Sequence, residues 1–357
     1  MSQHKVRDAE SATLSRRTVI GALGAGIAVA GSGASLAQPV APPTTITNPP
    51  RDFSRRGAPT TYFTDPDILS VDPVFDGIAQ PNSAIQRLWT GALWSEGPAW
   101  NAVGRYLVWS DIPNNRQLRW IEDDGRVSVF RMPSNNSNGN TFDFQGRQVT
   151  CEHTGRRISR YEHDGSITAV AETYMGQRLN SPNDVAPHRD GSYWFTDPPP
   201  GFTLYEGAPE ASGGTTNPEG RYNSRAGQPL GVGTAKREIT TANVFRVDPQ
   251  SGRVDMMVSG ANLPGIPNGI AFSPDYRKLY LVTNGIVHSF DLSAENKLSN
   301  QKEFTNFMVD GIQCRTDGIR VDVNGNLWCG SNAGRNVGYS GVTVWSPEAK
   351  LLGRIRL

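Results

Sequence analysis

The stretch from Asn180 to Gly201, NSPNDVAPHRDGSYWFTDPPPG, combines a hairpin signal with an unexpected polar pair. The Asp190-Gly191 pair predicts a tight turn, because it supplies the positive φ angles that such a turn needs between two strands. The aromatic run YWF that follows predicts the returning strand. Asn183 and Asp184, however, stand where the first strand begins. Their side chains need partners there, because buried polar groups are costly to leave unpaired.

The composition of the whole chain favours an all-β protein. Its 357 residues include 38 glycines and 25 prolines with scattered aromatic residues, a mixture typical of many short strands joined by tight turns. The net charge is +1, so attraction to a nucleic acid or an anionic membrane is not expected. Three cysteines, Cys151, Cys314 and Cys329, are an odd number and predict small buried side chains rather than a disulfide framework.

A repeat becomes visible when each turn glycine is traced back to a polar residue eight positions earlier. The pairs are Glu96 and Gly104, Asn138 and Gly146, Asn183 and Gly191, and Asp317 and Gly325. Asn268 starts a fifth unit with a slightly longer turn. These five polar residues, called the anchor residues below, are 42, 45, 85 and 49 positions apart, and the longest interval contains a Gly- and Pro-rich insertion at about 198–241. A period in the forties with four strands per unit is typical of β-propeller blades, so the sequence predicts five blades.

The propeller geometry predicts where the anchor residues lie. The first strand of each blade lines the central channel, so equivalent residues of all blades meet at one end of it. The second strand returns to the same end, which places five more residues near the anchor residues: Asp111, His153, Asp197, Asn284 and Asn332. Every anchor side chain carries oxygen. Two explanations remain open: a bound cation, or mutual hydrogen bonding around a water-filled channel.

Four ordered segments resemble the signature segments of the SMP-30/gluconolactonase/regucalcin-like family: LWSEGPAW, the opening stretch, PNGIAFSPDYRKLYLV and TDGIRVDVNGNLWCG. The segment GNTFDFQGRQVTCEHTGRRISRYEHDG is similar to the second blade of bacterial gluconolactonases. The resemblance covers roughly Ile85 to Leu357. It implies a six-bladed β-propeller that hydrolyses sugar lactones with a divalent cation. Five blades are visible, and the sixth is expected to be truncated at the C-terminus, which would leave an open sheet edge.

The resemblance also implies roles for individual residues. The family's metal-binding positions are matched by Glu96, Asn183, Asn268 and Asp317. Asp317 additionally matches the catalytic base, and Asn183 matches a residue that lies at the metal or contacts the substrate. Apart from the resemblance, Asn138 and His153 are further candidates for contact with the substrate. His153 is as consistent with a structural role as with substrate binding or proton transfer. Asp184 is expected to brace the turn after Asn183.

The implied donor set contains only oxygen, with two carboxylates and two amide carbonyls. Such a set favours a hard cation, Ca²⁺ first, with Mg²⁺, Zn²⁺ and Mn²⁺ as alternatives. The chain lacks an H-E-x-x-H motif, paired cysteines and a G-x-S-x-G motif, so neither a nitrogen- and sulfur-ligated zinc site nor a serine hydrolase is indicated. The expected function is hydrolysis of a small-molecule sugar lactone to the aldonic acid. Two alternatives stay open: a phosphotriesterase or other lactone or ester hydrolase at the same site, and a non-catalytic ligand-binding propeller.

The remaining segments predict targeting and accessory parts. Residues 1–37 resemble a twin-arginine signal peptide, with Arg16 and Arg17 before a weakly apolar run, so export to the periplasm without a membrane anchor after cleavage is expected. Residues 38–84 form a Pro-rich arm that begins with a linker to about residue 59, and residues 85–357 form the propeller domain. The segment AIQRLWTG, 84–91, is expected to be an outer strand of the last blade, and the insertion 198–241 a lid or pocket wall.

Overall fold

The computed structural model of the protein describes residues 65–80, 83–199, 201 and 237–357. The predicted signal peptide, the linker to about residue 59 and nearly all of the insertion lie outside these residues. The described part consists of β-strands and three short 3-10 helices: η1 (Pro73–Gly77), η2 (Gly260–Asn262) and η3 (Val337–Tyr339). It contains no helix that is long and apolar enough to cross a membrane.

Five antiparallel sheets follow one another along the chain, each with four consecutive strands. The first blade contains β2 (Ser95–Asn101), β3 (Tyr106–Asp111), β4 (Arg116–Ile121) and β5 (Val127–Arg131). The second contains β6 (Ser137–Phe142), β7 (Gln148–Glu152), β8 (Arg157–Tyr161) and β9 (Ile167–Ala171). The third contains β12 (Val185–Pro187), β13 (Tyr193–Asp197), β14 (Asn243–Val247) and β15 (Val254–Val258).

The last two blades repeat the same strand order. The fourth contains β16 (Pro267–Phe272), β17 (Lys278–Thr283), β18 (Ile286–Leu292) and β19 (Leu298–Glu303). The fifth contains β22 (Arg315–Val321), β23 (Leu327–Asn332), β24 (Gly341–Trp345) and β25 (Leu351–Arg356). Two small hairpins lie between blades. One, β10 (Thr173–Tyr174) with β11 (Gln177–Arg178), follows the second blade, and the other, β20 (Met308–Val309) with β21 (Ile312–Gln313), follows the fourth.

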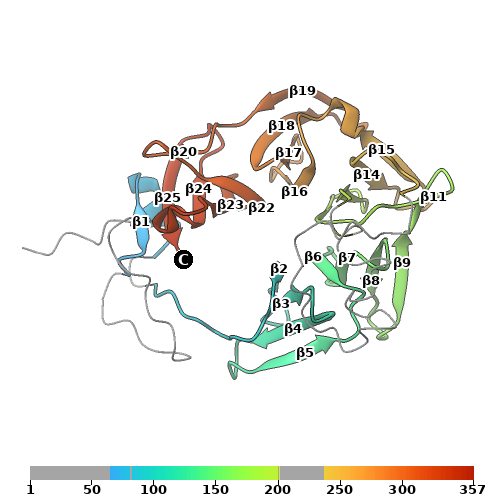
Figure 1. Ribbon diagram of the computed structural model, residues 1–357, viewed down its shortest axis with the longest axis horizontal. Coiled ribbons are helices and arrows are strands. Elements are labelled where there is room, and N and C mark those ends of the chain that lie inside the picture. Colours follow the sequence, from blue (N-terminus) through green and yellow to red (C-terminus); the bar gives the residue numbers. More distant parts are fainter. Residues whose placement is uncertain (1–64, 81–82, 200, 202–236) are drawn as a thin grey trace, which may run out of the picture. The chain divides into compact units, whose positions relative to one another are not determined.

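The first strands of neighbouring blades pack against each other in chain order. Strand β2 contacts β6, β6 contacts β12, β12 contacts β16, and β16 contacts β22. Figure 1 shows the sheets following one another with these inner strands toward the centre. The prediction of an all-β propeller with five visible blades is therefore confirmed. None of the described residues forms the sixth blade that the family resemblance implies.

The hairpin that the opening stretch predicts is formed by β12 and β13, where Pro187 lies opposite Tyr193. Its turn is wider than a two-residue turn, and of the Asp-Gly pair only Gly191 has a positive φ, of 87°. The Asp190 side chain instead accepts hydrogen bonds from the backbone N–H and the hydroxyl of Ser192, at 2.8 and 2.6 Å. This side-chain bonding stabilises the turn in place of a second left-handed residue.

Strand β13 shows how one sheet contributes to two cores. Successive side chains of a strand point to opposite faces. Phe195 accordingly packs with Phe245 in the cluster that joins the second and third blades. Trp194 packs edge-on against Phe272 in the cluster that joins the third and fourth blades. The three cysteines are unpaired and buried, as predicted.

The fifth blade gains an additional outer strand from the Pro-rich arm. Strand β1 (Ile68–Ser70) pairs antiparallel with β25, and Phe75 of η1 is buried against the same blade. By contrast, residues 84–91 form no strand, so the prediction of an outer strand there is wrong. A strand needs a partner to satisfy its backbone groups, and the arm segment 68–70 occupies the edge of β25 instead.

Candidate active site

All five anchor residues line one cavity of about 410 Å³. The other polar residues that line it are Asp184 and Arg320, and apolar contacts come from Pro98, Ile319, Trp328 and Val342. The anchor residues lie in or just before the innermost strand of each of the five blades. The predicted convergence of the anchor residues is therefore confirmed, although their individual roles stay predictions.

An irregularity at the start of the innermost strands turns the anchor side chains toward this cavity. The pairing register shifts between Glu96 and Ala99 in β2. Equivalent shifts occur at the starts of β6, β16 and β22. Such bulges bend a strand locally and change the direction of a side chain. The glycine that follows the anchor residue also matters: a Cβ on Gly97 would lie 2.2 Å from the carbonyl oxygen of Asn138. Only glycine allows the two blades to approach this closely.

Hydrogen bonds between neighbouring blades hold the backbone of the anchor residues. The Asn138 carbonyl accepts from the Ser110 hydroxyl at 2.7 Å, and the Asn183 carbonyl accepts from the Gly139 N–H at 2.8 Å. The Asn268 carbonyl accepts from the Thr196 hydroxyl, also at 2.8 Å. These bonds fix the positions of the main chain. The side chains, rather than the backbone carbonyls, are therefore the groups that a ligand in the cavity can use.

The two acidic anchor residues influence each other. Burial raises the pKa of the Glu96 carboxyl to about 7, and the negative charge of Asp317 contributes to the rise. Partial burial and the charge of Asp184 likewise raise the pKa of Asp317, while a hydrogen bond with the Asn268 side chain opposes this rise. The Trp94 indole N–H donates to Glu96 Oε1 at 3.0 Å. The negative charges of neighbouring carboxylates raise the pKa of both groups, so the cavity would favour a positively charged ligand.

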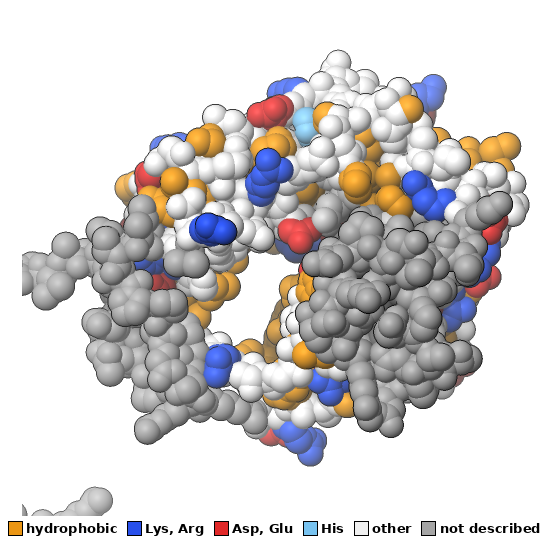
Figure 2. Space-filling view, in the orientation of Figure 1, with side chains coloured by type: hydrophobic (Ala, Val, Ile, Leu, Met, Phe, Trp, Pro, Cys, Tyr) orange, Lys and Arg blue, Asp and Glu red, His pale blue; other side chains and the backbone are white. Residues whose placement is uncertain are grey.

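Asp184 accepts a hydrogen bond from the adjacent Val185 N–H at 2.9 Å, and it also has partners on other blades that the sequence did not predict. Arg320 donates to both carboxylate oxygens of Asp184, at 2.9 and 3.2 Å, and also to the Asn140 carbonyl at 3.2 Å. Asp184 further accepts from the backbone N–H of Ile270 at 3.2 Å. This two-pronged ion pair connects the second, third, fourth and fifth blades beside the cavity. Figure 2 shows acidic and basic atoms together at the edge of the central hollow.

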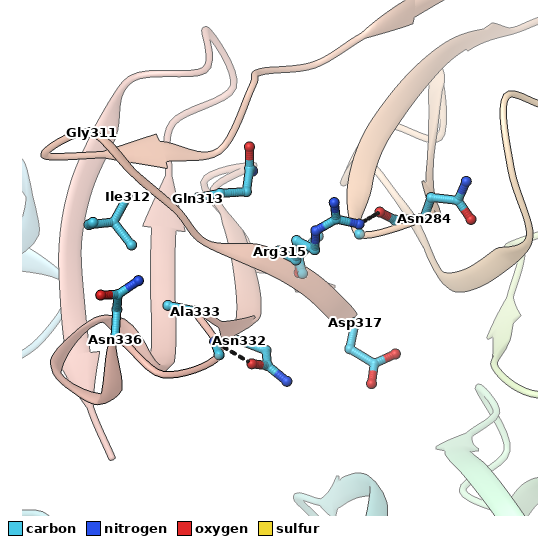
Figure 3. Close-up of a pocket in the computed structure, with 12 residues that line it drawn as sticks. Asn284, Gly311, Ile312, Gln313, Arg315, Asp317, Asn332, Ala333 and Asn336 are labelled. Carbon is cyan, nitrogen blue, oxygen red and sulfur yellow. Dashed lines mark hydrogen bonds between the residues drawn. The ribbon is translucent and has the colours of Figure 1, made fainter. Parts of the chain in front are cut away.

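The residues at the ends of the second strands divide into two groups. Asn284 and Asn332 line a second cavity, of about 700 Å³, which shares Asp317 with the first (Figure 3). Asp111 is instead bound to Arg116 at 2.9 Å, and Asp197 accepts from the backbone N–H of Asn180 at 2.8 Å. Neither of these two carboxylates lines either cavity. Two of the five predicted neighbours therefore share a cavity with an anchor residue.

His153 reaches the site through Asn138. Its Nε2 lies 3.3 Å from the Asn138 side-chain nitrogen, which makes the ring nitrogen the acceptor of this hydrogen bond. Burial lowers the pKa of His153 to about 4, so the imidazole is neutral near pH 7. The ring also packs against Gly201, where an added Cβ would lie within 2.4 Å of it. His153 is thus placed to orient Asn138, and its contact with a substrate stays a prediction.

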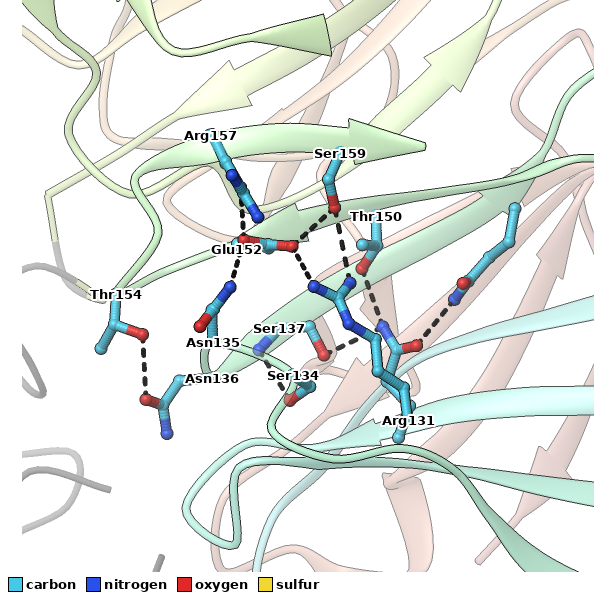
Figure 4. Close-up of polar contacts among 12 residues, drawn as sticks. Arg131, Ser134, Asn135, Asn136, Ser137, Thr150, Glu152, Thr154, Arg157 and Ser159 are labelled. Atoms are coloured by element: carbon cyan, nitrogen blue, oxygen red, sulfur yellow. Dashed lines mark hydrogen bonds and ion pairs between the residues drawn. The ribbon is translucent and has the colours of Figure 1, made fainter. Parts of the chain in front are cut away.

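A buried ion network holds the strand that precedes His153 (Figure 4). The Glu152 carboxylate accepts from Arg131 at 2.6 Å and from Arg157 at 2.7 Å, and it also bonds to Ser159 and Asn135. Burial alone would raise the pKa of Glu152, but the Arg131 charge and these hydrogen bonds lower it overall. Glu152 therefore stays ionised and connects strands of the first and second blades.

We expect Glu152→Gln to lower the free energy of unfolding by about 3–5 kcal/mol, because it leaves the buried Arg131 charge without its partner. Urea unfolding at pH 7 measures this loss. Glu122→Gln is the matched control, since it removes an exposed pairing with Arg105 that is worth about 1 kcal/mol or less. Equal losses for both variants would show that the network does not stabilise the fold as a buried ion pair.

The donor chemistry of the first cavity is oxygen alone. Among the described residues, no group of three or more His, Cys, Asp or Glu side chains is arranged to hold a metal ion. A cation at the anchor residues would therefore need their amide oxygens in addition to the two carboxylates. Asn and Asp oxygens of this kind are ordinary ligands of hard cations, so the residues present fit such an ion.

The fold and the cavity together define a β-propeller with an oxygen-lined site at one end of its inner strands. The chain belongs to the SMP-30/Gluconolactonase/LRE-like family, whose sequence profile matches residues 94–357. A curated gluconolactonase from Zymomonas mobilis is 26% identical over 310 residues, which cover 81% of this chain and 76% of that protein.

One solved structure supports the same family, and a second shares the fold. A gluconolactonase from Xanthomonas campestris is 32% identical, with a TM-score of 0.65 over 81% of this chain and 84% of that one. A calcium-binding regucalcin from Agrobacterium tumefaciens is 18% identical, with a TM-score of 0.53 over 76% of this chain and 77% of that one. The second likeness concerns the fold alone. The family named from the sequence segments is therefore confirmed.

Proposed function

We propose that the protein is a metal-dependent lactonase that opens a sugar lactone to the aldonic acid. The observation that carries this proposal is the meeting of Glu96, Asp317 and three asparagines from five different blades in one cavity. The similarity to gluconolactonases at 26% and 32% identity supports the same reaction class. The calcium-binding relative supports only the fold.

Four residues would hold the cation: Glu96, Asn183, Asn268 and Asp317. A hard divalent cation, most simply Ca²⁺, would polarise the lactone carbonyl when bound. Glu96 and Asp317 have raised pKa values, and a bound cation would stabilise their ionised forms. Asn138, oriented by His153, would hydrogen-bond the substrate from the second blade.

Asp317 would act as the general base. Its carboxylate lines both cavities, where it can accept a proton from a water molecule beside the substrate. It would take a proton from the attacking water while the new C–O bond forms at the lactone carbonyl carbon. The ring C–O bond then breaks, and the same proton passes to the departing ring oxygen. The product is the hydroxy acid, and Asp317 returns to its starting state.

Removal of the cation tests this proposal directly. We expect EDTA to abolish lactone hydrolysis, and Ca²⁺ or another divalent cation to restore it, in a pH-stat assay of sugar lactones. Circular dichroism of the chelated protein checks that the blades remain folded. Turnover that survives exhaustive chelation would contradict the metal dependence. Failure to hydrolyse any lactone with any divalent cation would overturn the proposed activity.

Export through the twin-arginine pathway stays a prediction, because residues 1–37 lie outside the described residues. The role of the insertion as a lid stays a prediction for the same reason.

A further inference from the structure

The second cavity, which is lined by Asn284, Asn332 and Asp317 among others, carries one positive and one negative side chain. Its described lining is made of neutral residues with one cation, Arg315, and one anion, Asp317. The neutral polar side chains are amides: Asn284, Gln313, Asn332 and Asn336. Figure 3 shows Arg315 and Asp317 extending from the same strand, β22. A polar cavity of about 700 Å³ beside the proposed base has room for the part of a substrate that does not react.

Arg315 is held in place by neutral groups. Its Nη1 donates to the Asn284 carbonyl at 3.2 Å, and its side-chain stem lies against Gly285. A Cβ on Gly285 would lie 2.8 Å from the Arg315 Cβ, so the glycine leaves room for the stem. Within the described residues, no carboxylate lies within ion-pair distance of Arg315, whereas Arg116, for example, pairs with Asp111. The guanidinium is thus positioned, and its charge is not neutralised by the described chain.

The spacing of the two charges gives the cavity a direction. Arg315 and Asp317 are two residues apart in β22, which separates their backbone positions by about 7 Å along an extended strand. One hexose-sized molecule can span this separation. Arg315 would attract an anionic group to its own end of the cavity, about one hexose length from Asp317. A lactone with an acidic substituent would therefore lie with its carbonyl toward Asp317.

We propose that this cavity selects sugar lactones that carry an anionic group, a carboxylate or a phosphate, and that Arg315 binds that group. The inference rests on the proposed lactonase activity and narrows its substrate class. A guanidinium presents parallel N–H donors that match the oxygens of both anions. Arg315 is a specificity-determining residue in this proposal, and it takes no part in the proton transfers at Asp317.

Steady-state kinetics on three lactones test the proposal: glucono-δ-lactone, which is neutral, a glucarolactone, which carries a carboxylate, and 6-phosphoglucono-δ-lactone. The intact chain should have a higher kcat/KM for at least one anionic lactone than for the neutral one. Arg315→Met should lower kcat/KM for that substrate by about 10- to 100-fold, mainly through KM, and change the neutral lactone by less than about 3-fold. The preferred anionic lactone then tells whether a carboxylate or a phosphate is recognised.

Two variants serve as controls. Arg277→Met makes the same change at an exposed arginine in the turn between β16 and β17, and should leave all three rates unchanged. Arg315→Lys keeps the charge without the planar fork and should retain part of the preference. An equal loss for neutral and anionic lactones in Arg315→Met, or no preference in the intact chain, would overturn the proposal.

Binding separates this proposal from the proposed reaction. Calorimetric titration of glucarate and of 6-phosphogluconate, the open-chain products, requires no turnover. If no lactone were hydrolysed but one of these anions bound the intact chain and not Arg315→Met, the anion site would stand while the lactonase activity failed. If lactones were hydrolysed and neither anion depended on Arg315, the activity would stand and the anion site would be wrong.

Discussion

Replacing Asp317 with asparagine will lower kcat for lactone hydrolysis by roughly 10²–10⁴-fold, the range for a lost general base. Asparagine keeps a carbonyl oxygen that can still bind a hard cation, but it cannot accept a proton. The neighbouring groups stay in place, because Asn268 can hydrogen-bond to either side chain. Rate assays at saturating Ca²⁺, combined with calorimetric titration of Ca²⁺, separate the two effects. Metal affinity should fall only modestly.

The matched control for this variant is Asp123→Asn, the same chemical change at a largely exposed residue of the first blade. It should leave both turnover and cation affinity unchanged. Asn183→Ala and Asn268→Ala should weaken the cation site without removing the base, because each removes one neutral oxygen. Near-normal turnover in Asp317→Asn would require another residue to take the proton.

Much of the fold followed from positions that repeat in the sequence. The interval of eight from anchor residue to turn glycine is set by one strand plus one turn, and both are local. Asn183 and Gly191 illustrate this, because a hairpin forms there as predicted, although its turn is wider than the tight turn expected from Asp190-Gly191. Convergence of the anchor residues then follows from blade geometry alone, since equivalent strand positions must meet at the channel.

The contacts that the sequence did not predict join residues far apart in the chain. Arg320 and Asp184 are separated by 136 positions, and only the closure of successive blades brings them together. The sequence offered one indication of this ion pair: Arg320 is a positively charged residue in an inner strand, and Asp184 is an acidic residue beside another inner strand. The pairing of β1 with β25 is likewise non-local, with 68–70 opposite 353–355. A short segment of a Pro-rich arm carries no pattern that names its partner strand.

The sequence also did not predict how deeply individual side chains are buried. The position of His153 after β7 predicted a place near the anchor residues, and its hydrogen bond with Asn138 agrees with that. Its neutral state near pH 7 depends on how completely neighbouring blades cover the ring, which lowers its pKa to about 4. Proton transfer by His153 is therefore disfavoured at neutral pH, and an orienting role through Asn138 is favoured.

Replacing Glu96 with glutamine should act on the cation rather than on the proton transfer. The variant removes a negative charge from the proposed coordination sphere, so we expect the affinity for Ca²⁺ to fall by at least about 10-fold. Activity should fall at low Ca²⁺ and return, at least in part, when the cation is added in excess. Asp317→Asn should show the opposite pattern, with low turnover that added Ca²⁺ does not restore. Calorimetry and rate assays across a Ca²⁺ series measure both responses.

Trp94→Phe is the matched control for Glu96→Gln, because it removes the indole N–H that donates to Glu96 Oε1 and keeps the carboxylate. It should change Ca²⁺ affinity far less than the loss of the charge does.

The comparison also decides between the two explanations of the oxygen-lined channel. If the anchor residues only hydrogen-bond to one another around water, Glu96→Gln should alter the stability to urea and leave Ca²⁺ titrations unchanged, because no ion then depends on the carboxylate. A Ca²⁺ affinity that falls with the charge, while the midpoint of unfolding of the metal-free protein stays near that of the intact chain, is the result expected for a cation site.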